Sequence, residues 1–236
     1  MDETVHILWT GGWDSTYRIL EILLRSDWKI QPHYIVDPER MSAPREMEAM
    51  EQIRRSIAER NPDWAGRIME TRITDLEDIP QDPTIEAAFK EVRGREYIGS
   101  QCCWLARYVK MLGLQGIEIC NESSDTWGGR IAAISSRVPG VEPQQYELSP
   151  ELSEAGSEMQ VLFKWFRFPL VHYGKRDMER AIDHMDAWAV MAKTWFCHRP
   201  VRSRYPCGTC RPCVYVMEKG QGWRLGPIGR VDRERR

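Results

Sequence analysis

The chain has 236 residues, of which 42% are hydrophobic and 29% are charged, enough for one sizeable α/β domain with a small appendage. Its formal net charge of −2 does not favour a nucleic-acid partner. The N-terminal stretch MDETVHILW has no basic region and no long apolar region, so no secretory signal is expected. No apolar run reaches the roughly 18 residues of a membrane span. A cytoplasmic protein without a membrane partner is therefore predicted.

The predicted elements begin with a strand over residues 5–9, which runs into the glycine turn Thr10-Gly11-Gly12 and a helix capped by Asp14 or Ser15. A second strand, a long charged helix and a third strand are expected over residues 30–36, 42–60 and 67–73. The pattern then predicts a helix over residues 102–112 and strands over 116–120 and 161–168. A further helix is predicted over 175–185. Gly113 suits a helix C-cap, and residues 139–156, rich in Pro, Glu and Ser, suggest an exposed excursion.

This alternation of strands and helices predicts an α/β fold with a doubly wound parallel sheet and helices on both faces. In such sheets, ligands bind beyond the carboxyl ends of the strands. The loops that begin at Thr10, Asp37 and Asn121 all follow predicted strands. Chemistry is therefore expected in these loops.

The segment WTGGWDST, residues 9–16, carries the strongest local signal. Its two glycines let the backbone turn tightly and approach an anion, and the start of the next helix adds N–H groups and a favourable dipole. Thr10, Ser15 and Thr16 add hydroxyl donors. The segment matches neither G-x-x-x-x-G-K-[ST] nor G-x-G-x-x-G. It is suited to hold a pyrophosphate, and an ordinary strand–turn–helix junction is the alternative.

Four of the seven cysteines have the spacing C-x9-C-x2-C-x2-C near the C-terminal end: Cys197, Cys207, Cys210 and Cys213. Without a secretory signal, clustered cysteines more often bind metal than form disulfides, and four thiolates complete a tetrahedral Zn²⁺ site. A redox pair at Cys207 and Cys210 would need a βαβ context, which is lacking. An iron–sulfur run would need a cysteine where Met217 stands. The other cysteines are expected in the core.

The glycine turn resembles the S-G-G-x-D-S signature of PP-loop ATP pyrophosphatases, with Thr10 in place of the serine. Combined with the cysteines, it resembles the 7-cyano-7-deazaguanine synthase (QueC) family from about Ile7 to Val216. Three further segments are similar to that family in the same order: the strand at 116–120 followed by Asp125, Phe168-Pro169-Leu170 followed by Lys175, and Thr194-Trp195-Phe196-Cys197. The resemblance implies an adenine nucleotide alpha hydrolase-like fold with a small C-terminal zinc knuckle.

The resemblance also implies roles for particular residues. ATP would be bound by Thr10, Gly11, Gly12, Asp14, Ser15 and Thr16. The catalytic set would be Lys175, Asp125 and Asp14. Lys175 would steady the α-phosphate, Asp14 would order the loop or Mg²⁺, and Asp125 would bind substrate or Mg²⁺. The substrate would contact Gln101, Asp125 and Trp127. An exposed lysine, a helix N-cap and a packed tryptophan are the respective alternatives for Lys175, Asp125 and Trp127.

The implied reaction is the adenylylation by ATP and Mg²⁺ of a deazaguanine-type acid, 7-carboxy-7-deazaguanine. Pyrophosphate is released, and an amine takes the acyl group to give an amide. When the amine is ammonia, the amide is activated by ATP again and dehydrated to the nitrile. Such a ligase would serve queuosine biosynthesis. The implied organisation is a nucleotide-binding domain over residues 1–190, a zinc-binding segment over 191–220 and a basic tail over 221–236.

The chain departs from the family in three runs near the expected substrate pockets: residues 36–40 (VDPER), Gln101-Cys102 and residues 127–130 (WGGR). These departures motivate a second hypothesis, in which the acid is joined to a protein amine, as in QueC-like proteins of antiphage defence. A third hypothesis is a zinc-stabilised nucleotide- or RNA-binding module without catalysis. The sequence leaves a homodimer open.

Overall fold

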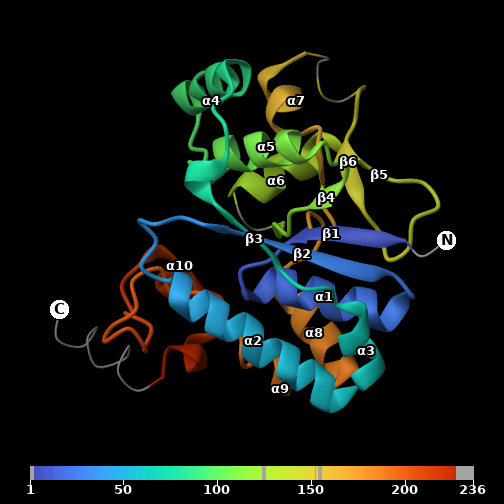
Figure 1. Ribbon diagram of the computed structural model, residues 1–236, viewed down its shortest axis with the longest axis vertical. Coiled ribbons are helices and arrows are strands. Elements are labelled where there is room, and N and C mark those ends of the chain that lie inside the picture. Colours follow the sequence, from blue (N-terminus) through green and yellow to red (C-terminus); the bar gives the residue numbers. More distant parts are fainter. Residues whose placement is uncertain (1–2, 124–125, 152, 154–155, 227–236) are drawn as a thin grey trace. The chain divides into compact units, whose positions relative to one another are not determined.

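The structure, a computed structural model, describes residues 3–123, 126–151, 153 and 156–226. A five-stranded parallel sheet in this part has the order β3-β2-β1-β4-β7 (Figure 1). The strands are β1 Thr4–Leu8, β2 Lys29–Val36, β3 Arg72–Asp75, β4 Ile117–Glu118 and β7 Phe166–Arg167. The strand order reverses beside β1, because β2 and β3 lie on one side of it and β4 and β7 on the other. The predicted α/β class with a parallel sheet is confirmed.

The helices of the described part are α1 Trp13–Arg25, α2 Ala43–Arg60, α3 Pro62–Arg67, α4 Pro83–Arg95, α5 Gln101–Leu112, α6 Thr126–Ala133, α7 Glu158–Phe163, α8 Lys175–Met185, α9 Trp188–Met191 and α10 Arg211–Glu218. Short 3-10 helices cover Leu76–Asp78 and Gly222–Leu225. None of the described helices combines the length and the apolar character that crossing a bilayer requires.

The chain divides into two compact units, and α1 begins in the second and continues into the first. The first comprises Met1–Leu8, Arg18–Ile35 and Arg67–Gly174, and it holds the sheet and helices α4 to α7. The second comprises Trp9–Tyr17, Val36–Gly66 and Lys175–Arg236. It therefore contains the glycine turn, helices α2 and α8 to α10, and the four clustered cysteines.

The core of the first unit lies between the sheet and the helices that follow its strands. Helix α5 buries Leu105, Ala106 and Val109, which recur at helical spacing and pack with residues of β4, β7 and α7. Each such fully buried aliphatic side chain of the size of leucine contributes about 1.5–3 kcal/mol. Gly113 ends α5 with φ of 63°, as predicted for a C-cap, because glycine adopts this left-handed conformation without steric cost.

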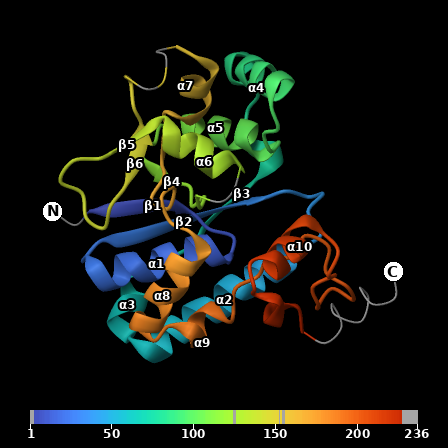
Figure 2. The ribbon, with the colours of Figure 1, turned by 180° about the vertical axis from the view of Figure 1, so that it is seen from behind.

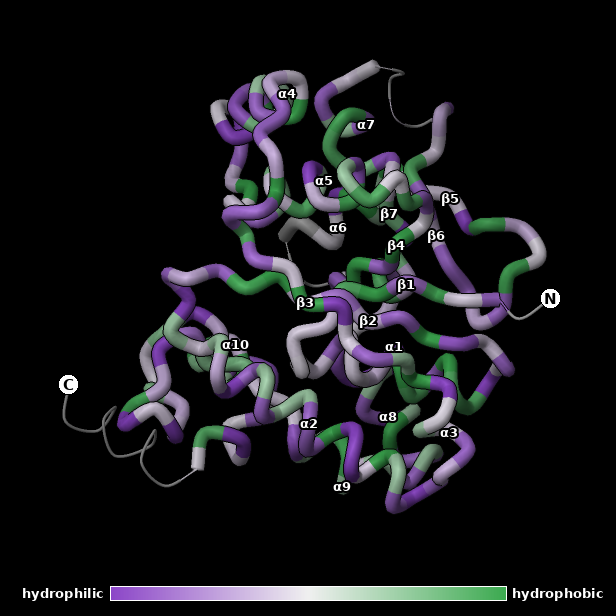
Figure 3. Tube along the Cα trace, viewed as in Figure 1, coloured by the Kyte–Doolittle hydropathy of each residue, from purple (hydrophilic) through white to green (hydrophobic). Residues whose placement is uncertain are grey.

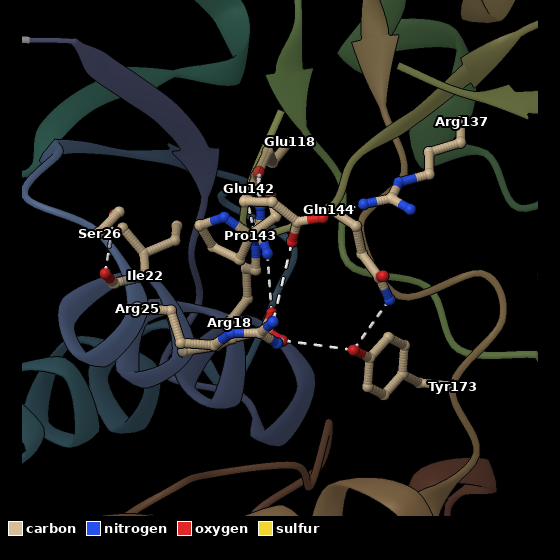
Figure 4. A network of polar contacts seen from close by, with 11 residues as sticks. Arg18, Ile22, Arg25, Ser26, Glu118, Arg137, Glu142, Pro143, Gln144 and Tyr173 are labelled. Carbon is tan, nitrogen blue, oxygen red and sulfur yellow. Dashed lines mark hydrogen bonds and ion pairs between the residues drawn. The ribbon is translucent and has the colours of Figure 1, made fainter. Parts of the chain in front are cut away.

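A buried ion-pair network ties α1 to β4 within the first unit (Figure 4). The guanidinium of Arg18 is fully buried and donates to Glu118 at 2.6 and 2.9 Å and to Glu21 at 2.7 Å. Burial alone would lower the pKa of Arg18, but the charges of Glu118 and Glu21 raise it above its ordinary value. Arg18 also donates to the carbonyl of Pro143, and Gln145 donates to Glu118 at 2.9 Å.

Those last two contacts correct the prediction that residues 139–156 form an exposed excursion. Strand β6, Tyr146–Leu148, pairs antiparallel with β5, Ser135–Arg137. Leu148 is buried at 6% exposure and Ser149 at 1%. The composition of the segment is typical of a loop, but polar groups within it are satisfied by the buried Arg18 network rather than by solvent.

The predicted strand over residues 161–168 is only partly right. Helix α7 occupies its first half, because Ser157 accepts the N–H of Gln160 as an N-cap and Met159, Leu162 and Phe163 bury one helical face. Strand β7 covers only Phe166–Arg167. The third strand also begins later than predicted, at Arg72, because Arg67 ends α3.

Helix α4 was not predicted, although its start carries a clear signature. Asp82 accepts the N–H groups of Thr84 and Ile85, both at 3.1 Å, and Pro83 occupies the first turn. Asp82 and Pro83 therefore mark the start of this helix.

In the second unit, α2 presents an apolar face formed by Ala49, Met50, Ile53 and Ile57. Figure 3 shows the resulting alternation of hydrophobic and hydrophilic residues along α2. At the C-terminal end of α2, Arg60 donates to the backbone carbonyls of Met185 and Asp186. Figure 2 shows α8 and α9 beside this half of α2.

Candidate functional site

The glycine turn follows β1 directly, and it needs glycine for two separate reasons. Gly11 has φ of +67°, which side chains other than glycine rarely adopt. A Cβ atom there would also lie 3.1 Å from the carbonyl oxygen of Glu46 and from the amide of Met50 in α2. The turn is fixed from its other side, since the N–H of Trp195 donates to the carbonyl of Gly11 at 2.8 Å.

The hydroxyls predicted to bind ATP do not all face the same way. Thr10, Gly12 and Asp14 line a cavity of about 230 Å³, and every residue that lines it belongs to the second unit. Thr16 is fully buried, and its hydroxyl oxygen accepts a hydrogen bond from Trp9 Nε1 at 3.1 Å. Thr16 therefore supports the turn from the protein interior, and Ser15 is buried next to it at 8% exposure.

The structure brings together two residues of the predicted catalytic set. Lys175 is the first residue of α8, and its ammonium group forms an ion pair with the carboxylate of Asp14 in the first turn of α1. Lys175 is only 9% exposed and lines the same cavity. The interpretation of Lys175 as a solvated surface lysine is therefore wrong.

Of the remaining predicted site residues, the structure describes Gln101 fully, Trp127 only by its backbone, and Asp125 not at all. Gln101 is an exposed side chain at the start of α5, in the first unit. Trp127 lies in the first turn of α6, and its side chain lies outside the described part. Asp125 also lies outside the described residues.

The four clustered cysteines converge, as predicted. The sulfur atoms of Cys197, Cys207, Cys210 and Cys213 all lie within 4.8 Å of one another. Sγ of Cys210 is 3.9 Å from that of Cys197 and 3.4 Å from that of Cys213, and Cys207 and Cys213 are 3.9 Å apart. A tetrahedral zinc with bonds of about 2.3 Å requires sulfur separations of roughly 3.8 Å. The donor set and its spacing therefore fit zinc.

Backbone groups around the cluster stabilise thiolates. The N–H of Cys207 points to the sulfur of Cys197 at 3.2 Å, and the N–H groups of Thr209 and Cys210 point to the sulfur of Cys207 at 3.4 and 3.2 Å. Side-chain hydrogen bonding with Cys197 and Cys213 lowers the pKa of Cys210, so the cluster favours a thiolate at this position. Such N–H contacts orient the sulfur ligands of a metal.

Residues that neighbour the clustered cysteines in the sequence form part of the wall of the cavity. Trp195 and Phe196, which precede Cys197, line it, as do Pro212 and Tyr215 on α10. Trp195 Nε1 also donates to the carbonyl of Cys197 at 2.7 Å. A metal that fixes the knuckle would therefore also fix this wall.

Three charged residues of the cavity were missed by sequence reasoning: Arg40, Glu46 and Arg224. Arg40 pairs with the buried Glu46 at 3.0 Å, and the hydroxyl of Ser42 donates to Glu46 at 2.8 Å. Arg40 lies in the run 36–40 that departs from the QueC pattern, so that departure was the available signal. No sequence signal pointed to Arg224, because the sequence analysis assigned it to a basic tail.

No family model and no curated protein gives a significant match to the chain. The QueC-like resemblance therefore rests on the motifs alone.

Proposed function

We propose that the chain is an ATP-dependent ligase that adenylylates a carboxylic acid, releases pyrophosphate and transfers the acyl group to an amine. The observation that carries this proposal is the convergence of the glycine turn, Asp14 and Lys175 on one cavity. Backbone N–H groups at the start of α1 suit a pyrophosphate, and a lysine suits the charge that develops on the α-phosphate. The PP-loop fold and the use of Mg²⁺ with ATP belong to the same proposal.

In the proposed first step, a carboxylate oxygen attacks the α-phosphorus of ATP. The bond to the bridging oxygen breaks, and pyrophosphate leaves with the electron pair. In the second step, an amine nitrogen attacks the acyl carbon, AMP leaves and the nitrogen loses a proton to solvent. Lys175 would leave its partner Asp14 for the triphosphate, and Asp14 would then be available to a magnesium ion. The zinc has a structural role, since its knuckle supplies part of the cavity wall.

The motif resemblance makes 7-carboxy-7-deazaguanine the first acid to test. The assay follows pyrophosphate release from Mg-ATP with this acid, with and without ammonium, and identifies the products by mass spectrometry. A nitrile product would support the synthase hypothesis. An adenylate that persists until a protein amine is added would support the conjugating hypothesis.

Lys175→Ala is expected to slow pyrophosphate release by about 100-fold or more, the usual cost of removing a group that stabilises transition-state charge. Lys193→Ala is the matched control, because Lys193 is exposed and follows α9 in the same unit. Its rate should equal that of the wild type. Absence of pyrophosphate release with any acid, together with salt-sensitive RNA binding, would contradict the ligase and favour the binding-module hypothesis.

A further inference from the structure

Arg224 is held rigidly at the wall of the cavity, beyond the cysteine cluster in the sequence. Its guanidinium carbon lies 4.8 Å from the ring centre of Trp13 and 4.6 Å from that of Phe196. Nη2 donates to the hydroxyl and the carbonyl of Thr194 at 2.8 and 3.3 Å, and Nη1 donates to Gln221 at 3.2 Å. A guanidinium that is fixed in this way is already positioned for a ligand.

The charge of Arg224 is not neutralised in the way that the other cations of the cavity are. Lys175 pairs with Asp14, and Arg40 pairs with Glu46. Within the part of the chain that the structure describes, no carboxylate lies within ion-pair distance of Arg224. Burial lowers the pKa of Arg224 to about 10 despite the opposing effect of the charge of Asp14, so the group still carries its charge at neutral pH. A positive charge that is partly removed from water and has no carboxylate in direct contact favours an anionic ligand.

A second, independent feature lies next to it. Trp13 is 5% exposed and lines the same cavity, and its indole Nε1 is a buried donor that has no hydrogen-bond partner among the described residues. Buried indole N–H groups usually find an acceptor. Arg224 and Trp13 therefore line one cavity, where Arg224 has no carboxylate in direct contact and Trp13 Nε1 lacks an acceptor among the described residues.

We propose that Arg224 and Trp13 form a subsite for an anionic oxygen of the ligand, either a phosphate of ATP or the carboxylate of the acid. The subsite deepens the proposed ligase function and takes its two ligand classes from it. It lies in the same cavity as the Asp14–Lys175 pair but uses different side chains, and Arg224 belongs to the segment that follows the clustered cysteines. The stretch that sequence reasoning treated as a basic tail thus contributes a substrate contact.

Isothermal titration calorimetry on the full-length, zinc-loaded protein tests the subsite without requiring turnover. The probes are inorganic pyrophosphate, α,β-methylene-ATP with Mg²⁺, and 7-carboxy-7-deazaguanine. Arg224→Gln should weaken binding of at least one probe by about 10- to 100-fold, because it removes a charge-assisted hydrogen bond. Trp13→Phe keeps an aromatic ring under the guanidinium but removes the N–H, and should weaken the same probe roughly 3- to 10-fold. Arg176→Gln, on the exposed side of α8, is the control.

The pattern of losses identifies the source of the anion. Weaker binding of pyrophosphate or the ATP analogue assigns the subsite to phosphate, whereas weaker binding of the acid alone assigns it to the carboxylate. Losses that accompany a lower melting temperature and lower zinc content in both variants would overturn the proposal, because they indicate a structural role. The proposal also fails if both variants bind all probes as tightly as Arg176→Gln, or if the wild type binds none. Tight binding by the wild type without pyrophosphate release would refute only the ligase function.

Discussion

In both units, buried or partly buried charged side chains form ion pairs. In the second unit, Asp14 and Glu46 each neutralise one cation of the cavity. In the first, Arg18 is satisfied by Glu118 and Glu21, all three at 3% exposure or less. The two sets of ion pairs differ in their access to ligands. A ligand that enters the cavity can replace Asp14 or Glu46 as the partner of a cation, whereas no ligand can reach the buried Arg18.

Glu118→Gln is therefore expected to destabilise the protein by about 3–5 kcal/mol, the usual cost of removing one partner of a buried ion pair. Urea unfolding followed by circular dichroism measures this loss. Glu51→Gln removes an exposed partner of Arg55 on α2 and should change stability little. The double variant Arg18→Met/Glu118→Leu should recover part of the lost stability. A loss below about 1 kcal/mol in Glu118→Gln would show that Glu21 alone satisfies Arg18.

At the scale of elements, the segments that flank the clustered cysteines supply part of the cavity wall. Short segments on either side of these cysteines carry Trp195, Phe196 and Arg224, none of which lies in a long helix or in a strand of the sheet. Ala49 of α2 and Leu225 pack against the cysteines in one apolar cluster. Because this region has little regular structure, a metal bound by the four cysteines would order it.

The purified protein is expected to contain one zinc ion per chain, bound by the four cysteines. Cys210→Ser should lose most of the zinc and lower the melting temperature by about 4–8 °C, which corresponds to roughly 2 kcal/mol in a chain of this size. Treatment of the wild type with a strong chelator should have the same effect. Metal content is measured by inductively coupled plasma mass spectrometry. Cys103→Ser, outside the cluster, should retain zinc, and an unchanged metal content in Cys210→Ser would rule out the four-thiolate site.

At the scale of the whole molecule, stability depends on groups that are buried in an uncharged state. His33 is 1% exposed, and its ring nitrogens lie 2.8 Å from His6 Nδ1 and 2.8 Å from the hydroxyl of Tyr108. Burial, followed by the nearby His6 and Arg72, lowers the pKa of His33 to about 3. The folded protein therefore keeps this ring neutral in mild acid, where an unfolded chain would protonate it.

Because the unfolded state binds the additional proton, the free energy of unfolding should fall as the pH drops below about 6.5. The slope due to His33 approaches 1.4 kcal/mol per pH unit and ends near the folded-state pKa of about 3. Urea titrations between pH 5 and pH 7 measure it. His33→Gln should reduce this slope, whereas His184→Gln, exposed on α8, should leave it unchanged. An equal slope in His33→Gln and the wild type would contradict the assignment.

Local sequence patterns predicted the parts of the molecule that are contiguous in the chain. The strand, glycine turn and helix at residues 5–25 are encoded by an apolar run, two glycines and a helical stripe. The spacing of Cys207, Cys210 and Cys213 brings three sulfurs together within one short turn, so their convergence follows from the spacing alone. The α/β class followed from the order of such segments.

Only the tertiary structure decided which distant segments share a site. Arg40 and Arg224 are far apart in the sequence, yet both line the cavity of the glycine turn. Pro143 and Gln145 belong to a stretch with the composition of an exposed loop and are nevertheless bound to the buried Arg18 network. Periodicity and spacing report the conformation of adjacent residues, because backbone sterics and local hydrogen bonds act over a few positions. Contacts between remote side chains depend on how the whole chain packs, and no local pattern encodes them.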